Sequence, residues 1–599
     1  MSKRSWIAAS GALALTVTLA ACANVPTSGT IQVSKLHGTA AIGQNSVQVV
    51  PKPPRRNWSP QDIVGSFLTA SAFDPTHVIP RKYLTGGKHG FASKWRPGWQ
   101  ATIIDTETVK NAQPLGGKGI TDPGGGPQPQ VVEVTGKRIT KLVSAGRYQA
   151  GSIVVGKANT VFRFGLVQVR GQWRINDISV NDGPANPSLL LLVKRDFERE
   201  YQSRNLYFYP ASASRMTLIP DPVYIPARAG NEGIAGLVRT LITPGLGNGR
   251  SWLFGAAQTA FPPGTKLLSA QVVGGITAIV NLGGAAAKAS PSQRQLMAAQ
   301  LHWSLVDNQP YPSEAPSTIS SVVLKINGQP VDQRQTFNDW VSHAPSGPLY
   351  YQVATGPEGP GVAWLRSKAP KTGSVPLPNP LAGQPFKATA VSAEPFGSAV
   401  VAGCTGKTVY LMPQSHEGQV ITAQLPAPCT SLSWDQLGNL WVATKMQVYE
   451  IQGVGSQPPA RPSVTDVLIS QMQLGKAGIQ SLQVAPDGVR VAMLIHDRTG
   501  SKIRIAAISK SQGQGTYIAQ TDQVLRVGTD LTDPRSLTWL DPNHLLVLDR
   551  LGSGRTQLFD VPLNGGQSTP IATPHGVQSV TASWPSGQSE PSIAVAIPG

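Results

Sequence analysis

A short phrase recurs in the C-terminal part of the chain and limits the folds that this part can adopt. SLSW begins at Ser431, SLQV at Ser481 and SLTW at Ser536, and a weaker copy, SVTA, begins at Ser579. Each of the first three copies precedes a turn rich in Gly, Asp or Asn and then an apolar run such as LWVAT or VRVAMLI. A period of about 40–55 residues, with short strands and a tight turn in each unit, is typical of a β-propeller. We therefore predict a propeller of about five to seven blades over 336–599, with a β-sandwich as the alternative.

The N-terminus has the pattern of an export signal. Two basic residues precede the uncharged stretch WIAASGALALTVTLAA, which is shorter than the ~20 residues that a membrane-spanning helix needs. The stretch ends in LAAC, which resembles the lipobox of bacterial lipoproteins, whose cysteine thiol receives diacylglycerol. We predict a signal peptide at 1–21 and lipidation at Cys22. An ordinary signal peptide that happens to have a cysteine near its end is the alternative.

Acylation would decide where the protein lies. Several acyl chains such as palmitate, at ~0.8 kcal/mol for each buried CH₂, make dissociation from a bilayer very slow. No later segment has the length and apolarity of a membrane span. We therefore predict a chain anchored to the cell membrane and folded on its extracytoplasmic face. Residues 22–57 lack a long periodic pattern and end in PKPPRRN, which predicts a lipidated stalk.

The remaining two cysteines agree with an exported protein. The chain has three cysteines, so acylation of Cys22 leaves Cys404 and Cys429 as a pair in an oxidising compartment. A disulfide between them would close a loop and contribute about 3 kcal/mol in the chain-entropy model. Two buried free thiols are the alternative. A zinc site is not expected, because no cluster of His or Cys lies near them in the sequence.

Two further modules are predicted between the stalk and the propeller. Over 58–185, a helix that begins at Ser59-Pro60 precedes alternating strands and the phrase GQWRI, which resembles the NTF2-like α+β architecture. Over 215–335, the phrases FPPGT, ITAIVNL and VVLKINGQPV resemble the GerMN domain of spore-germination lipoproteins. Residues 186–214 form an inter-domain segment. The expected fold class is multidomain and mainly β, with two α+β modules.

The charge of the chain does not indicate nucleic acid as a partner. The net charge is +19, from 51 basic and 32 acidic residues, but no block of Lys or Arg exceeds two residues. No basic stripe is interleaved with aromatic residues. Basic residues scattered over a solvated surface are the expected explanation. Lipid headgroups and anionic wall polymers remain alternative partners for the excess charge.

The sequence lacks the usual motifs of catalysis and cofactor binding. There is no G-x-S-x-G elbow and no HExxH, and the GKT at Gly406 lacks the glycine that a phosphate-binding loop requires. We therefore predict no catalytic residue, no metal ligand and no cofactor, so the protein is not expected to be an enzyme. A carboxylate pair of the kind that hydrolyses glycosides stays open, because such pairs form across a fold.

The order of these parts resembles one family. Lipobox, stalk, NTF2-like segment, GerMN module and propeller, together with the phrase YQSRNLYF at Tyr201, are similar to the LpqB family of actinobacterial lipoproteins. The resemblance implies an accessory factor of the Mtr two-component system. It implies that the lipoprotein binds the external domain of the MtrB sensor histidine kinase and modulates signalling in envelope homeostasis and division. A receptor for cell-wall glycan or muropeptide is the alternative function, and an envelope hydrolase is a third.

Overall fold

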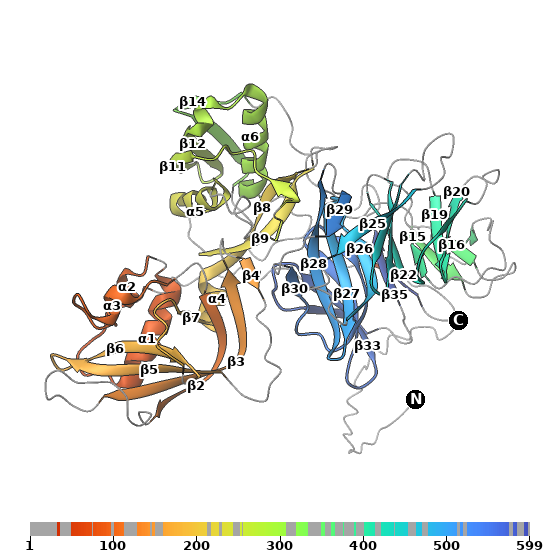
Figure 1. Cartoon of the computed structure of the whole chain (residues 1–599). Helices are drawn as coiled ribbons and strands as arrows, with labels where there is room; N and C mark the ends of the chain where they lie inside the picture. Colours follow the sequence, from red (N-terminus) through yellow and green to blue (C-terminus); the bar gives the residue numbers. More distant parts are fainter. Residues whose placement is uncertain are drawn as a thin grey trace, which may run out of the picture.

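The chain folds into three modules that follow one another along the sequence, in a computed structural model (Figure 1). The first module carries the longest strands, the second lies beside the propeller, and the propeller forms the C-terminal part. Strands dominate all three modules. The residues that the structure describes are 33–35, 50–74, 76–97, 101–112, 129–143, 147–149, 160–181, 183–211, 217–226, 230–242, 252–253, 255–306, 319–332, 349–353, 361–365, 375–376, 388–390, 400–413, 421–435, 438–452, 463–469, 477–511, 515–518, 524–573, 579–583 and 592–596.

Helix α1 (Pro60–Phe73) begins where the sequence predicts. The Ser59 side chain accepts a hydrogen bond from the backbone N–H of Asp62, and the Asp62 carboxylate accepts one from the backbone N–H of Ser59. These reciprocal bonds satisfy two donors that a helix start otherwise leaves unpaired. The buried face of α1 includes Phe67 and lies on the sheet of the first module. Two short helices, α2 (Val78–Arg81) and α3 (Phe91–Lys94), follow.

The sheet of the first module has the order β6-β5-β3-β2-β7, and β4 pairs with β3 outside this path. Strand β7 lies parallel to β2, with Leu190 opposite Ala101. The apolar LLLV run of the predicted inter-domain segment is thus a strand of the first sheet, because it is buried by α1 on that sheet. The strands are β2 (Ala101–Ala112), β3 (Gln130–Val143), β4 (Arg147–Gln149), β5 (Thr160–Val169), β6 (Gln172–Val180) and β7 (Leu190–Val193).

Helix α4 (Lys194–Glu200) connects the first module to the second. In the second module, β12 and β13 run parallel, as expected for strands joined by the crossover helix α6. The turn after β13 is at Asn327-Gly328, where both residues have positive φ. The remaining elements are β8 (Tyr201–Pro210), β9 (Ile219–Pro226), α5 (Gly230–Ile242), β10 (Ala257–Gln258), β11 (Thr265–Val273), β12 (Thr277–Gly284), η2 (Ala285–Lys288), α6 (Pro291–Val306), β13 (Ser321–Ile326) and β14 (Gln329–Pro330).

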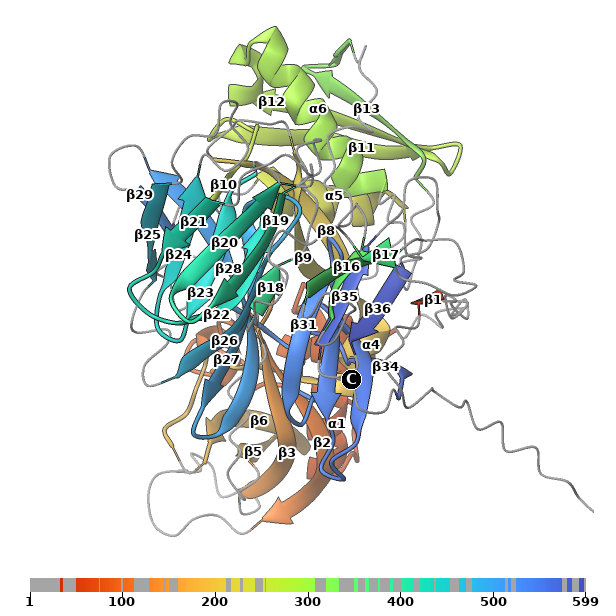
Figure 2. The ribbon, with the colours of Figure 1, turned by 90° about the vertical axis from the view of Figure 1, so that its right-hand side faces the viewer.

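The C-terminal part is a β-propeller in which we number six blades in chain order. Figure 2 shows the strands of blades 2 to 4 stacked side by side. Blades 3 and 4 join in one sheet through the parallel pair β25–β29. The blades are β15–β17 (349–376), β18–β21 (388–424), β22–β25 (429–469), β26–β30 (478–527), β31–β34 (534–572), and β35 (Ser579–Ser583) with β36 (Ser592–Ala596).

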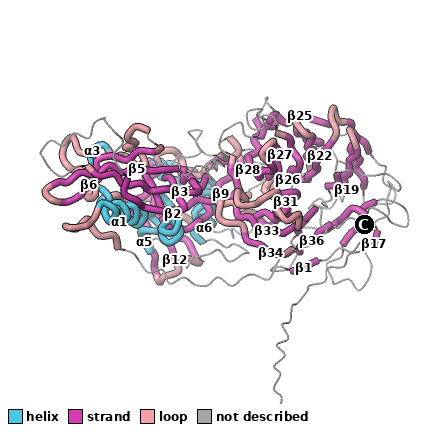
Figure 3. Tube along the Cα trace, turned by 90° about the horizontal axis from the view of Figure 1, so that it is seen from below, coloured by secondary structure: helices cyan, strands magenta, loops and turns pink. Residues whose placement is uncertain are grey.

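The sixth blade takes a strand from the other end of the chain. Strand β1 (Val33–Lys35) pairs antiparallel with β36, with the backbone of Val33 opposite Ala594. Figures 2 and 3 both place β1 at the edge of this blade. Part of the predicted stalk is therefore a propeller strand, which a periodic pattern could not indicate in a segment of three residues. In the described part of the chain, no helix has both the length and the apolarity needed to cross a bilayer.

Candidate interaction surface

The repeated serines of the propeller form the seam between neighbouring blades. Ser431, on the innermost strand β22 (Cys429–Trp434), donates from its hydroxyl to the carbonyl of Leu482 and accepts from the N–H of the same residue. Leu482 belongs to β26 (Gly478–Val484), the innermost strand of the next blade. One buried hydroxyl thus satisfies both backbone groups of a residue in the adjacent blade.

Two further serine hydroxyls accept from backbone N–H groups of an adjacent blade. The hydroxyl of Ser433 accepts from the N–H of Val484, and that of Ser536 accepts from the N–H of Val580. At the end of the third repeat, the Trp539 indole donates to a carbonyl of the preceding blade. The recurring phrase therefore places hydroxyls and an indole where innermost strands meet. The sequence showed the repeat, but the partner strands could be assigned only from the fold.

A buried charge lies next to this seam. Arg490 is fully buried, its Nε donates to the Asp487 carboxylate at 2.5 Å, and its guanidinium lies 5.0 Å from the ring centroid of Trp539. Asp487 also accepts from the backbone N–H groups of Val489 and Arg490, which fixes the turn that the sequence analysis assigned to a blade. The Asp487–Arg490 pair thus joins a tight turn to the indole of the next blade. This arrangement is structural, because the charge does not reach solvent.

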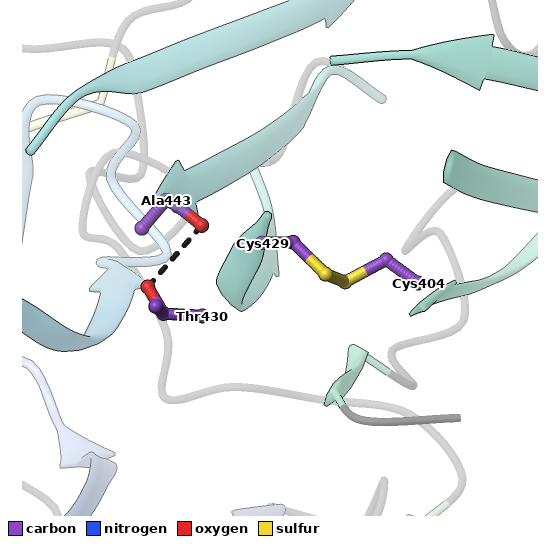
Figure 4. The surroundings of a disulfide bond; sticks show 4 residues. All are labelled: Cys404, Cys429, Thr430 and Ala443. Carbon is purple, nitrogen blue, oxygen red and sulfur yellow. Dashed lines mark hydrogen bonds between the residues drawn. A yellow bond between two sulfur atoms is a disulfide. The ribbon is translucent and has the colours of Figure 1, made fainter. Parts of the chain in front are cut away.

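The disulfide predicted from the sequence is present. Cys404 lies on β19 (Val400–Thr405) of blade 2 and Cys429 begins β22 of blade 3, and their sulfur atoms are bonded (Figure 4). Both residues are buried in the apolar cluster between the two blades. Next to it, the Thr430 hydroxyl donates to the carbonyl of Ala443, 3.2 Å away. The bond therefore links adjacent blades covalently at the same level as the serine seam.

One serine, histidine and aspartate come together at the rim of blade 4. The His496 Nδ1 and the Ser501 hydroxyl are 3.1 Å apart, and the same hydroxyl donates to the Asp533 carboxylate at 3.3 Å. In a hydrolytic triad the carboxylate orients the histidine, whereas here it binds the serine directly. The hydroxyl is also shared with the Gln480 amide oxygen. This geometry provides no relay from serine to histidine to carboxylate.

A second acid–base cluster lies on blade 5. The His544 Nδ1 and the Asp541 carboxylate are 2.8 Å apart, and Asp541 also accepts from the N–H of Asn543. Burial raises the pKa of the nearby Asp560, an effect that the charge of His544 opposes and that of Asp541 reinforces. The predicted turn residues Asp541 and Asn543 thus bind each other. None of these residues lines the two cavities described below.

Two cavities of the first module are small. A cavity of about 240 Å³ lies between α1 and residues 50–52, and one of about 290 Å³ lies beside Val180 and residues 183–187. Both are below the ~300–1,000 Å³ of usual ligand pockets. No three His, Cys, Asp or Glu side chains of the described ranges gather as metal ligands. The predicted lipidation site, Cys22, lies outside the described residues.

What the structure does build is a continuous apolar core across two modules. One cluster includes Trp252 and Leu301 of the second module and also Ala485 and Trp539 of blades 4 and 5. A hydrogen bond from the Ser509 hydroxyl to the carbonyl of Gly255 crosses the same boundary. Shared burial of this kind opposes independent motion of the two modules. We call them together the module–propeller unit: residues 201–332 and the propeller.

The first module meets this unit through aromatic rings. Phe197 on α4 stacks on Tyr201 at 4.9 Å between ring centroids and contacts Tyr224 at 5.1 Å. Tyr201 is the first residue of the phrase YQSRNLYF that the sequence analysis compared with a known family. That phrase therefore supplies packing residues. The contact is smaller than the apolar core of the module–propeller unit. The largest rigid surface of the protein is therefore that of the module–propeller unit.

We expect Ser431→Ala to weaken the propeller. The change leaves the buried N–H and carbonyl of Leu482 without their partner, which costs about 1–3 kcal/mol. Urea denaturation followed by tryptophan fluorescence measures the loss. Ser463→Ala removes an exposed hydroxyl from an outer strand and should change stability by less than about 0.5 kcal/mol. Equal effects of the two changes would contradict a role of Ser431 in the seam.

We expect the propeller to lose about 3 kcal/mol of stability when both Cys404 and Cys429 are replaced by alanine, because the unfolded chain gains the freedom of the opened loop. Thermal melting with and without reductant measures this. The reductant should lower the melting temperature of the native chain and leave that of the double variant unchanged. A native melting temperature that does not respond to full reduction of the bond would contradict the prediction.

Comparison with known proteins identifies each module. The family described as the Lipoprotein LpqB N-terminal domain matches residues 53–183, that described as Sporulation and spore germination matches 205–332, and that described as the Lipoprotein LpqB beta-propeller domain matches 367–593. Among solved structures, a catalytically inactive virginiamycin B lyase from Staphylococcus aureus has a TM-score of 0.25 and 11% identity, over 42% of this chain and 77% of that chain.

Curated relatives match along nearly the whole length. A protein named Lipoprotein LpqB from Thermobifida fusca is 26% identical over 95% of this chain and 92% of its own length. Lipoprotein LpqB from Streptomyces coelicolor is 27% identical over 93% and 88%, and that from Mycolicibacterium smegmatis is 24% identical over 89% and 85%. With all three modules matched in this order, the chain belongs to the LpqB lipoprotein family.

Proposed function

We propose that this chain is a lipid-anchored accessory protein that binds the external domain of the MtrB sensor histidine kinase and modulates its signalling in envelope homeostasis and division. The observation that carries the proposal is the module–propeller unit. Its shared apolar core holds two modules as one rigid surface, and rigid surfaces bind partners without a large cost of ordering. Membership of the LpqB family supports the choice of partner.

A lipid anchor on Cys22 determines which partners this surface can reach. An acylated N-terminus confines the chain to the plane in which a sensor kinase displays its external domain. Confinement raises the effective concentration of the two proteins, so a weak contact suffices. The relatives named as lipoproteins support anchoring.

A non-catalytic role is supported by the geometry of the polar clusters. At Ser501 the carboxylate binds the hydroxyl instead of the histidine, and at His544 the imidazole pairs with Asp541 with no serine or cysteine nucleophile in the cluster. Neither cluster lines one of the two cavities described above. We therefore assign the protein a binding function, in which partner recognition takes the place of chemistry.

We expect Cys22→Ser to release the protein from the membrane, because the hydroxyl does not accept the diacylglycerol that a thiol accepts. Fractionation of cells followed by detection of the chain tests this, and mass spectrometry of the native N-terminal peptide looks for the lipid. The matched control is Ser34→Ala, which retains the cysteine. A Cys22→Ser protein that stays with the membrane would show that the anchor lies elsewhere.

We expect the chain from residue 23 onward to bind the purified external domain of the kinase with a measurable Kd, and the external domain of an unrelated sensor kinase to show no binding. Crosslinking followed by peptide mapping should place the crosslinks on the module–propeller unit. Kinase output should change when the protein is deleted. Absence of binding together with unchanged output would overturn the proposal, and a thermal shift caused by wall fragments alone would favour a glycan or muropeptide receptor.

A further inference from the structure

The first described segment of the first module is strongly basic. Residues 50–97 contain eight Lys or Arg and two Asp. Both acids are engaged locally: Asp62 caps α1, and the buried Asp74 accepts from the N–H groups of Thr76 and Ile79. None of the basic side chains in this segment has a carboxylate partner among the described residues. Their charge is therefore available to an external partner.

The fold gathers these residues around α2 and α3. The Arg81 Nη1 donates to the carbonyl of Ala92 at 2.6 Å, which ties α2 to α3, and its guanidinium lies 5.3 Å from the ring centroid of Trp95. Burial lowers the pKa of Arg81, and the charge of the nearby Arg96 adds to this effect. The Ser93 hydroxyl donates to the carbonyl of Lys88. The loop that contains Lys88 therefore lies against α3.

The end of the stalk contacts a residue that follows α2. The Tyr83 hydroxyl donates to the carbonyl of Lys52 at 2.5 Å, next to the exposed Lys82. Figure 1 places α2 and α3 on the side of the first module that is remote from the propeller. We define the α2–α3 surface as six exposed residues on and around α2 and α3: Lys52, Val78, Lys82, Lys88, Lys94 and Arg96.

An apolar side chain projects from this charged layer. Val78 is 57% exposed, and Lys82 follows it by four residues, which places both on one side of the α2 turn. An exposed apolar residue beside a lysine suits a surface that is charged outside and apolar below. A lipid bilayer with anionic headgroups has this profile.

We propose that the α2–α3 surface docks on the anionic headgroups of the outer leaflet, so that the first module lies against the membrane. This inference rests on the lipid anchor of the proposed function, which holds the chain at the membrane. The positive charge of the surface and the confinement of the chain to the membrane favour lipid over a wall polymer. Five of the dispersed basic residues thus belong to one region of the fold.

The test uses the chain from residue 23 onward, which carries no lipid and retains every described residue. It should float with vesicles that contain phosphatidylglycerol at about 0.1 M salt, and not with pure phosphatidylcholine vesicles. At about 1 M salt the binding should be lost, because the Debye length falls to about 3 Å. Binding to both kinds of vesicle alike would overturn the proposal.

A matched pair of variants locates the surface. Changing Lys82, Lys88 and Lys94 together to Gln should weaken partitioning into anionic vesicles roughly 100-fold, at roughly fivefold for each lysine. Changing the exposed Lys110, Lys266 and Lys407 to Gln removes the same charge elsewhere and should have a much smaller effect. Circular dichroism and melting temperatures check that both variants fold.

Two results would count against docking at this surface. Equal binding by the two triple variants would show attraction by net charge alone. Binding of the chain to purified anionic wall polymer, without binding to anionic vesicles, would assign the surface to the wall. Because the unacylated chain is used, either failure leaves the Cys22→Ser fractionation result intact. Conversely, a protein that binds vesicles but carries no lipid on Cys22 would separate docking from anchoring.

Discussion

The apolar core shared by the second module and blades 4 and 5 is the constraint on which the arrangement of the protein depends. Trp252 and Trp539, more than 280 positions apart in the chain, are buried in one cluster. Apolar burial stabilises by roughly 25 cal/mol for each Å², so burying about 40 Å² contributes as much as one hydrogen bond of about 1 kcal/mol. The two modules therefore present one surface, while the first module joins them through a smaller aromatic contact.

Features set by short-range signals could be predicted from the sequence. The start of α1 was predicted because Ser59 and Pro60 have strong local preferences. The propeller repeat was visible because each blade uses the same phrase on its innermost strand. Cysteine arithmetic identified the disulfide, since the chain offers few pairings.

Features made by distant residues could not be predicted in this way. Strand β7 was assigned to a connecting segment, because its partner β2 lies about 90 positions earlier. The seam serines were seen as a repeat without a role, since their partners are on the next blade. The α2–α3 surface was described as scattered charge, because its residues come near one another only when the Tyr83 hydroxyl binds Lys52 and Arg81 packs on the Trp95 ring.

The pairing of β1 with β36 sets a limit on how far the propeller can stand from a lipid on Cys22. Val33 follows that cysteine by eleven positions, and a fully extended chain covers at most about 40 Å over such a length. An acylated chain would thus keep its last blade within that distance of the bilayer. The three residues of β1 would hold the propeller closed and near the bilayer. A force on the anchor would therefore act first on the blade in which β1 pairs with β36.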